Sequence, residues 1–289
     1  MKDWAEITKT RRLDMLERVV FPAIGKLPIR EVTPHHILRI LQETAKRGAP
    51  TVAAEARRTV SSVFELAVAT LRADSDPVRP VRKALPANKI QHKQALNPQQ
   101  IGKLLNCFDN SRGSYQVNYC MWLMWWTLTR PAEATEAEWT EFDLDNALWT
   151  IPAARMKARR EHVIPLPSQA IKMLRTLQGL TGHRQHLFPG RDNPLGPMTS
   201  HSLRQLRKSL GWSGTYSPHA TRTTGSTRLN EMGYRPDAIE AQLAHADTNN
   251  VRRTYNHATY LDERTVMMQD WANKLEEWVG SARSTIDVS

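Results

Sequence analysis

The most informative stretch of this chain is Leu243-Ala244-His245, followed after a short polar segment by Val251-Arg252-Arg253-Thr254-Tyr255. It places a tyrosine ten positions after a histidine (255 − 245). Upstream, Pro218-His219-Ala220-Thr221-Arg222 supplies a second histidine with an arginine three positions later. Earlier still, Thr129-Arg130-Pro131 supplies another arginine, and Lys157 lies between Arg130 and Arg222 in the sequence. The result is an ordered set of polar side chains: Arg130, Lys157, His219, Arg222, His245 and Tyr255.

These side chains are of the types needed to break a phosphodiester reversibly without water or a metal ion. A tyrosine can hold the phosphoryl group as an ester. Arginines can donate paired hydrogen bonds to the non-bridging oxygens, where negative charge builds up. One further group must protonate the departing oxygen, and another must orient or deprotonate the phenol. We therefore predict that Arg130 and Arg222 clamp a phosphate, with His219 on the same helical face as Arg222. Lys157, at the tip of a predicted hairpin, could reach the leaving oxygen.

Each of these residues taken alone has an ordinary structural explanation. An arginine beside a proline is usually a surface or capping residue, and a lysine in a hairpin turn is usually only solvated. A tyrosine near a C-terminal helix is usually at the edge of a core with a hydrated hydroxyl. Arg155, Arg159 and Arg160 also crowd the turn that carries Lys157. The prediction depends on the ordered occurrence of all six residues.

Composition favours a polyanionic partner. The formal net charge is +11, although surplus charge can also serve solubility alone. The two cysteines, Cys107 and Cys120, form no CxxC pair, so we expect a reducing compartment and neither a disulfide framework nor a zinc site. The N-terminus is polar, and the longest apolar run, residues 119–128, is about half of what a membrane span needs. We expect a soluble cytoplasmic protein without cofactor or metal.

Residues 1–73 are predicted to form a small helical bundle. Apolar residues recur at helical spacing within residues 10–20, 35–47 and 51–71, and Thr33-Pro34 is a typical helix start. Residues 74–97 contain three prolines and are predicted to be an extended, basic linker. The cations of the linker could follow a phosphate backbone, or could simply be solvated. They include Arg79, Arg82, Lys83, Lys89 and Lys93.

Residues 98–289 are predicted to form a second, mixed domain. Helices are expected at residues 99–108 and 115–128, the latter strongly apolar and therefore core. Two strands, residues 148–152 and 163–166, flank the basic turn 155–160. From residue 168 to about 279 the pattern is again helical, interrupted by the loop 189–197. The fold class is therefore mainly α with a small antiparallel sheet (α+β).

The ordered set resembles the tyrosine recombinase (phage integrase) family, and specifically the integrases of prophages and genomic islands. The most specific stretches are Arg130-Pro131-Ala132-Glu133, residues 143–157, and residues 230–255. The resemblance implies a 3′-phosphotyrosine at Tyr255 and phosphate binding by Arg130, Arg222 and His245. Lys157 would protonate the 5′ oxygen and His219 would assist proton transfer. Glu133 would support the site without reacting, and Arg159 and Arg160 would be among the residues that contact DNA.

The resemblance also implies architecture and partners. A helical core-binding domain and a catalytic domain would form a clamp around double-stranded attachment sites, and four subunits would join two duplexes, with DNA-bending accessory proteins possible. The C-terminal residues 260–279 would dock on a neighbouring subunit, or alternatively form an intramolecular amphipathic helix. The candidate docking residues are Leu261, Val266, Met267, Trp271, Leu275 and Trp278. Relatives of this subgroup usually begin with an arm-binding domain, which we do not find before residue 2.

The sequence departs from the family pattern at two positions and leaves three other functions open. Ala220 and Leu128 stand where many relatives have glycine. A type IB-like topoisomerase shares the tyrosine chemistry, but it would not need matched sites. A truncated integrase could act only as a DNA-binding protein. A metal-dependent nuclease is disfavoured, because His183 and His186 have no carboxylate cluster beside them.

Overall fold

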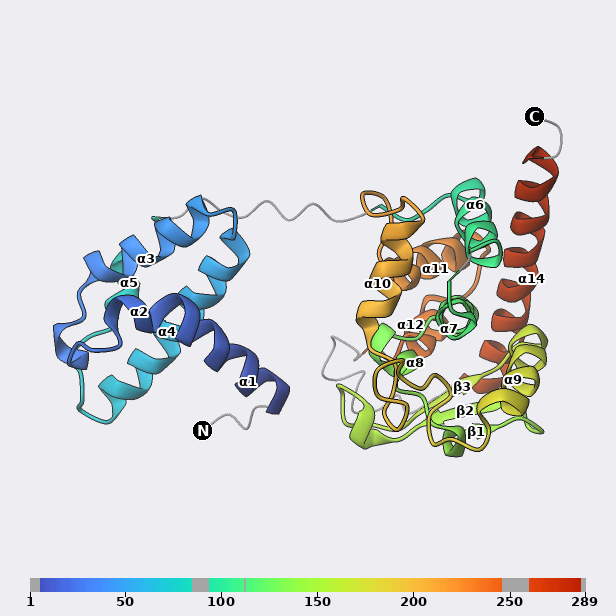
Figure 1. Cartoon of the computed structure of the whole chain (residues 1–289), viewed down its shortest axis with the longest axis horizontal. Helices are drawn as coiled ribbons and strands as arrows, with labels where there is room; N and C mark the ends of the chain where they lie inside the picture. The colour runs from blue at the N-terminus through green and yellow to red at the C-terminus, as the bar shows by residue number, and fades with distance from the viewer. Residues whose placement is uncertain (1–5, 85–93, 112, 246–259, 287–289) are drawn as a thin grey trace. The chain divides into compact units, whose positions relative to one another are not determined.

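The computed structural model describes residues 6–84, 94–111, 113–245 and 260–286. The chain divides into two compact units, residues 1–91 and 92–289 (Figure 1). The described residues are mainly helical with one small antiparallel sheet, which confirms the predicted fold class. None of the helices in the described part of the chain combines the length and apolar character that crossing a lipid bilayer requires.

The first unit is the predicted helical bundle. Its elements are α1 (Glu6–Met15), a π-helical turn (Leu16–Val20), α2 (Phe21–Ile24), a 3-10 turn (Ile29–Glu31), α3 (Pro34–Lys46), α4 (Pro50–Ala69) and α5 (Val78–Val81). At the start of α3, the Thr33 hydroxyl accepts from the His36 backbone N–H and the His36 ring accepts from the Thr33 N–H. The predicted helix start is therefore a reciprocal cap. The apolar faces of α3 and α4 meet in a core that includes Ile37, Leu41 and Phe64.

The prediction that residues 74–97 are extended is wrong for the part that forms α5. Val78 and Val81 are buried in the core of the first unit, and the Asp76 carboxylate accepts from the Val78 N–H (2.9 Å). Proline at position 77 suits the start of a helix, because it donates no hydrogen bond there. Arg79, Arg82 and Lys83 remain exposed around this turn. The chain therefore stays with the first unit at least to residue 84.

The second unit combines eight α-helices with three strands in the described residues. They are α6 (Pro98–Asp109), α7 (Tyr115–Thr127), α8 (Pro131–Thr135), β1 (Phe142–Asp143), β2 (Leu148–Ile151), β3 (His162–Pro165), α9 (Ser168–Thr181), α10 (Ser200–Ser209), α11 (Ala220–Glu231), α12 (Pro236–Gln242) and α14 (Leu261–Ile286), with short 3-10 turns at Trp139–Glu141 and Ala153–Arg155. The strands pair antiparallel in the order β1-β2-β3, with Trp149 opposite Ile164. The hairpin predicted between residues 148 and 166 is confirmed.

Helix α7 lies at the centre of the second unit. Its residues from Cys120 to Thr127 are all buried, as expected of a helix that is apolar on every face. The Trp125 ring stacks with Tyr216 and with Trp271, with ring centroids 6.0 Å and 6.3 Å apart. The Trp271 indole N–H donates to the Trp125 carbonyl (2.6 Å). The tryptophan-rich stretch is therefore core, as predicted.

Helix α14 packs on its own chain. Met267, Trp271 and Leu275 are fully buried in the core of the second unit, whereas Val266 on the opposite face is 59% exposed. The helix lies along α6, where a side chain at Gly102 would collide with the Trp278 carbonyl (Figure 1). The apolar surface of Met267, Trp271 and Leu275 is covered within the chain, which favours the intramolecular alternative for them. Docking of the segment on a neighbouring subunit stays a prediction.

Candidate active site

The loop between α7 and α8 holds the first predicted arginine. Leu128 ends α7 in the left-handed region (φ 54°), a conformation that glycine adopts at lower cost, and its side chain fills the space above Gly225 of α11. Pro131 then starts α8. The buried Glu133 carboxylate accepts from both the Arg130 backbone N–H (2.8 Å) and the Arg130 Nη1 (2.6 Å). Glu133 therefore holds Arg130 by its backbone and by its side chain.

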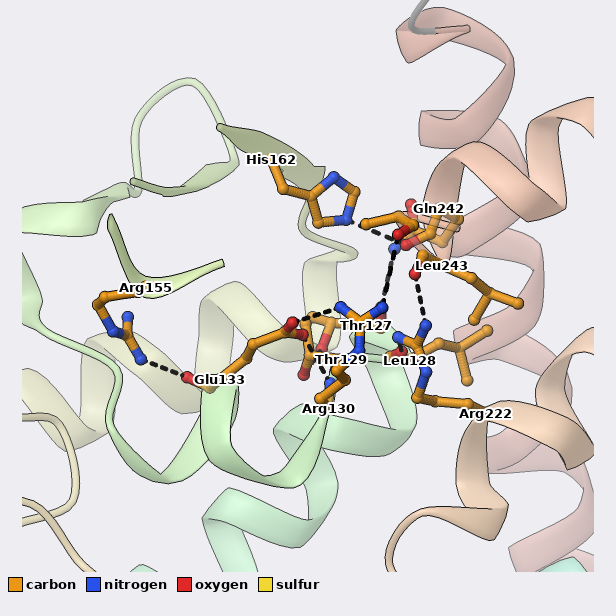
Figure 2. Close-up of polar contacts among 11 residues, drawn as sticks. Thr127, Leu128, Thr129, Arg130, Glu133, Arg155, His162, Arg222, Gln242 and Leu243 are labelled. Atoms are coloured by element: carbon orange, nitrogen blue, oxygen red, sulfur yellow. Dashed lines mark hydrogen bonds and ion pairs between the residues drawn. The ribbon is translucent and has the colours of Figure 1, made fainter. Parts of the chain in front are cut away.

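Arg222 belongs to the first turn of α11, and its guanidinium lies near that of Arg130. Its guanidinium is buried, and it donates to the Leu128 carbonyl (2.7 Å) and to the Leu243 carbonyl. Arg130 Nη2 lies 3.5 Å from the next carbonyl oxygen, that of Ala244. Figure 2 shows both guanidinium groups between the end of α7 and the end of α12. Burial, and then the charge of Arg130, lower the pKa of Arg222 to about 10, so it keeps its charge at neutral pH.

A second layer of polar contacts fixes the backbone that receives these arginines. The buried Gln242 side chain donates to the Thr127 carbonyl (2.8 Å) and accepts from Arg264 Nε of α14 (2.9 Å). Arg264 also donates to the Val163 carbonyl of β3 (2.7 Å). The His162 ring contacts the Gln242 carbonyl (3.1 Å), and burial, followed by the Arg264 charge, lowers its pKa to about 4, so the ring is neutral. This layer joins α7, α12, α14 and β3.

The sequence prediction missed Gln242, Arg264 and His162. One signal could have revealed Arg264, because it falls at helical spacing with Met267, Met268 and Trp271 on the buried stripe of α14. An arginine on an apolar stripe needs buried acceptors. Gln242 and His162 have no comparable signal, since their partners are backbone carbonyls that only the fold brings near.

The two predicted histidines lie near the arginine pair. His219 precedes α11 at its N-cap position and is exposed. Its pKa is lowered by partial burial, then by the charges of Arg222, Arg130 and His245, so the neutral ring is favoured at pH 7. His245 is exposed after α12, and its Nδ1 lies 2.6 Å from a Glu240 carboxylate oxygen. The fold therefore gathers four of the predicted residues: Arg130, His219, Arg222 and His245.

The remaining predicted residues are placed differently. Lys157 is exposed in the loop between β2 and β3, and no hydrogen bond or ion pair joins it to the described residues. Arg159 and Arg160 are exposed in the same loop. Tyr255, Lys89 and Lys93 lie outside the described residues. Among the described residues, no cluster of three His, Cys, Asp or Glu side chains could hold a metal ion.

Known proteins match both units. Residues 94–261 match the phage integrase family, and residues 1–84 match the phage integrase central domain. The chain therefore belongs to the phage integrase family, and the resemblance seen in the motifs is confirmed. Prophage integrase IntA of Escherichia coli (strain K12) is 37% identical over 258 residues, covering 89% of this chain and 62% of that protein. The integrase of Enterobacteria phage P4 is 33% identical over 291 residues, covering 95% and 66%. The chain thus spans about two thirds of the length of these curated relatives.

Solved structures share the fold. A fragment of lambda integrase, solved as a dimer bound to a COC′ core site, has a TM-score of 0.66 at 17% identity, covering 84% of this chain and 89% of that chain. The Tn1549 transposon integrase in complex with circular intermediate DNA has a TM-score of 0.66 at 18% identity, covering 92% and 94%. At this identity the likeness to these integrases establishes the fold alone.

Proposed function

We propose that this chain is a site-specific DNA recombinase that cleaves and rejoins DNA strands through a 3′-phosphotyrosine at Tyr255, integrating or excising a mobile element. The observation that carries the proposal is the arginine pair, Arg130 and Arg222. Two guanidinium groups are held together by one carboxylate and three carbonyls, all from the protein. Such an arrangement keeps net positive charge where a phosphodiester would sit.

The electrostatics support a division of roles. Arg130 and Arg222 neutralise the non-bridging oxygens, and His245 adds a further donor. His219 is neutral at pH 7 because its pKa lies below the usual value, so it can accept the phenolic proton. Lys157, on its exposed loop, would give a proton to the departing 5′ oxygen. No step of this scheme requires a metal ion.

The partners follow from the same proposal. The first unit would bind core-type attachment sites, with the exposed Arg79, Arg82 and Lys83 on the phosphate backbone. Arg159 and Arg160 of the catalytic hairpin loop, and Lys89 and Lys93, would add further phosphate contacts. Lambda integrase has been solved as a tetramer bound to a Holliday junction, and we propose a homotetramer on two duplexes for this chain. It would work on the bacterial chromosome in the cytoplasm, with accessory bending proteins.

A trapping experiment tests the chemistry directly. The protein is incubated in EDTA with a nicked duplex drawn from the DNA that flanks its gene, and covalent adducts are resolved on denaturing gels. We expect an adduct that Tyr255→Phe abolishes. Tyr115→Phe is the matched control, since it removes the same hydroxyl from an exposed ring on α7. An adduct that persists in Tyr255→Phe would refute the assignment.

The same assay separates the alternative functions. A truncated integrase that only binds DNA would shift the duplex without forming an adduct, and Tyr255→Phe would bind as well as the parent protein. A topoisomerase would relax supercoiled plasmids that lack any attachment site. A recombinase requires two matched sites, so product should appear only when both are supplied.

A further inference from the structure

The catalytic hairpin loop is the loop between β2 and β3, residues 152–161. It carries three arginines, and Arg155 is the one that is largely buried. Its side chain is 16% exposed, whereas Lys157, Arg159 and Arg160 lie at the surface. One arm of its guanidinium pairs with the carboxylate of Glu141, which is itself buried and also accepts from the Trp149 indole (2.9 Å). The other arm donates to the Glu133 backbone carbonyl (2.8 Å). The loop is therefore anchored at its start by a largely buried cation with partners on two other segments.

The second partner connects this anchor to the arginine pair. Glu133 uses its carboxylate to hold Arg130 and its backbone carbonyl to receive Arg155, as Figure 2 shows. Arg130 and Arg155 thus bind the same buried residue of α8, one at its carboxylate and the other at its backbone carbonyl. A displacement of Arg155 would change the position of the hairpin loop relative to the phosphate clamp, because Glu133 is fixed to that clamp.

The backbone between Arg155 and Lys157 has little conformational freedom. Met156 follows Arg155 directly and is buried in the core, and its N–H donates to the Ala153 carbonyl (3.2 Å). Arg159 N–H donates back to the Met156 carbonyl (2.9 Å) and closes a turn around Lys157. The base of the lysine is therefore fixed by two buried side chains in succession, while its own side chain projects into solvent.

We propose that Arg155 is a positioning residue that sets the reach of Lys157 toward the leaving oxygen, an inference that rests on the proposed function. In cleavage, the Tyr255 oxygen forms a bond to phosphorus and loses its proton to a base such as His219. The bond from phosphorus to the 5′ oxygen breaks, and that oxygen keeps the electron pair and takes a proton from the Lys157 ammonium. A misplacement of the donor by about 1 Å can cost on the order of a hundredfold in rate.

The leaving group provides a readout that a merely structural role would not change. When sulfur replaces the bridging 5′ oxygen at the scissile position, the departing thiolate is stable without a proton, so the general acid is no longer needed. Arg155→Lys keeps a cation beside Glu141, but a single ammonium cannot span both partners as the guanidinium fork does. Arg175→Lys is the matched control, since Arg175 makes an exposed ion pair with Asp145 at 3.5 Å.

The experiment measures single-turnover cleavage of both duplexes by the whole chain. We expect Arg155→Lys to cleave the oxygen substrate about ten- to a hundredfold more slowly and the sulfur substrate at nearly the parental rate. Lys157→Ala should show the same rescue, and Arg175→Lys should match the parent on both. Equal losses on both substrates would make Arg155 a structural residue only, and an undiminished rate on oxygen, or no rescue of Lys157→Ala by sulfur, would also overturn the inference. Failure of the parent protein to form an adduct on either substrate would instead overturn the proposed function.

Discussion

Two glycines in helices, Gly102 of α6 and Gly280 of α14, should respond in opposite directions to the same substitution. A Cβ at Gly102 would lie 2.1 Å from the Trp278 carbonyl oxygen and 2.7 Å from its carbon, so α14 would have to retreat by about 0.9 Å (3.0 − 2.1) to reach the closest distance that real Cβ atoms tolerate. A Cβ at Gly280 would meet nothing within 4 Å. Overpacking costs about 1–3 kcal/mol, and helix propensity returns at most about 1 kcal/mol.

We therefore expect Gly102→Ala to lower the free energy of unfolding by about 1–2 kcal/mol and Gly280→Ala to raise it by about 0.5–1 kcal/mol. Urea unfolding followed by tryptophan fluorescence reports the second unit, because every tryptophan except Trp4 lies in it. A unit of this size should shift in melting temperature by about 2–4 °C per kcal/mol. If both variants were equally stabilised, the close approach of α6 and α14 would be refuted.

Three further outcomes follow from the site. Burial lowers the pKa of His162 from 6.5 to about 4, so the stability that the neutral His162 ring contributes is present above pH 6.5 and is lost as the pH falls toward 4. Between these two pH values the free energy of unfolding, measured in urea, should fall by about 3 kcal/mol more in the parent than in His162→Gln. Gln242→Ala leaves the Thr127 carbonyl and Arg264 without a shared partner, so it should cost about 2–3 kcal/mol in thermal unfolding, whereas unchanged stability would show that these two hydrogen bonds contribute nothing. Arg130→Lys should slow adduct formation by about 10²–10³-fold in the suicide-duplex assay, and a loss below tenfold would argue against a bidentate clamp.

Much of the architecture could be predicted from the sequence because it depends on local patterns. The apolar period of α3 and α4, the proline after Thr33, and the continuous apolar run of α7 each determine an element within a few residues. The prediction of an extended linker is wrong at α5, because it rests on the prolines and not on the two valines, Val78 and Val81. Their burial in the first unit stabilises a helical turn that the local composition disfavours.

The candidate site was predictable only in part, for a physical reason. Arg130 and Arg222 belong to short motifs whose residue types match phosphate chemistry, so they could be named without a structure. Glu133, which holds Arg130, was named with them. The supports of Arg222 could not be named, because Arg222 donates to carbonyls 94 and 21 positions away, and every residue has a carbonyl. Arg264 was also missed, but it could have been found, since an arginine at helical spacing with apolar residues implies buried acceptors.

The supports also explain how the buried guanidinium group of Arg222 and the half-buried one of Arg130 can lie together before any phosphate arrives. Like charges at close range repel, and burial removes the water that would screen them. One carboxylate, that of Glu133, offsets one of the two charges. The charge of Glu240 also favours charged Arg222, although the two side chains are not paired. The hydrogen-bonded compensation of Arg222 comes from carbonyls at the ends of α7 and α12, where the last turn of a helix carries partial negative charge. Partial charges stabilise the arginines but do not neutralise them. A carboxylate paired directly with Arg222 would have made the pair more stable and removed the positive charge that a phosphodiester needs, so the use of backbone carbonyls is what keeps this site both folded and able to bind an anion.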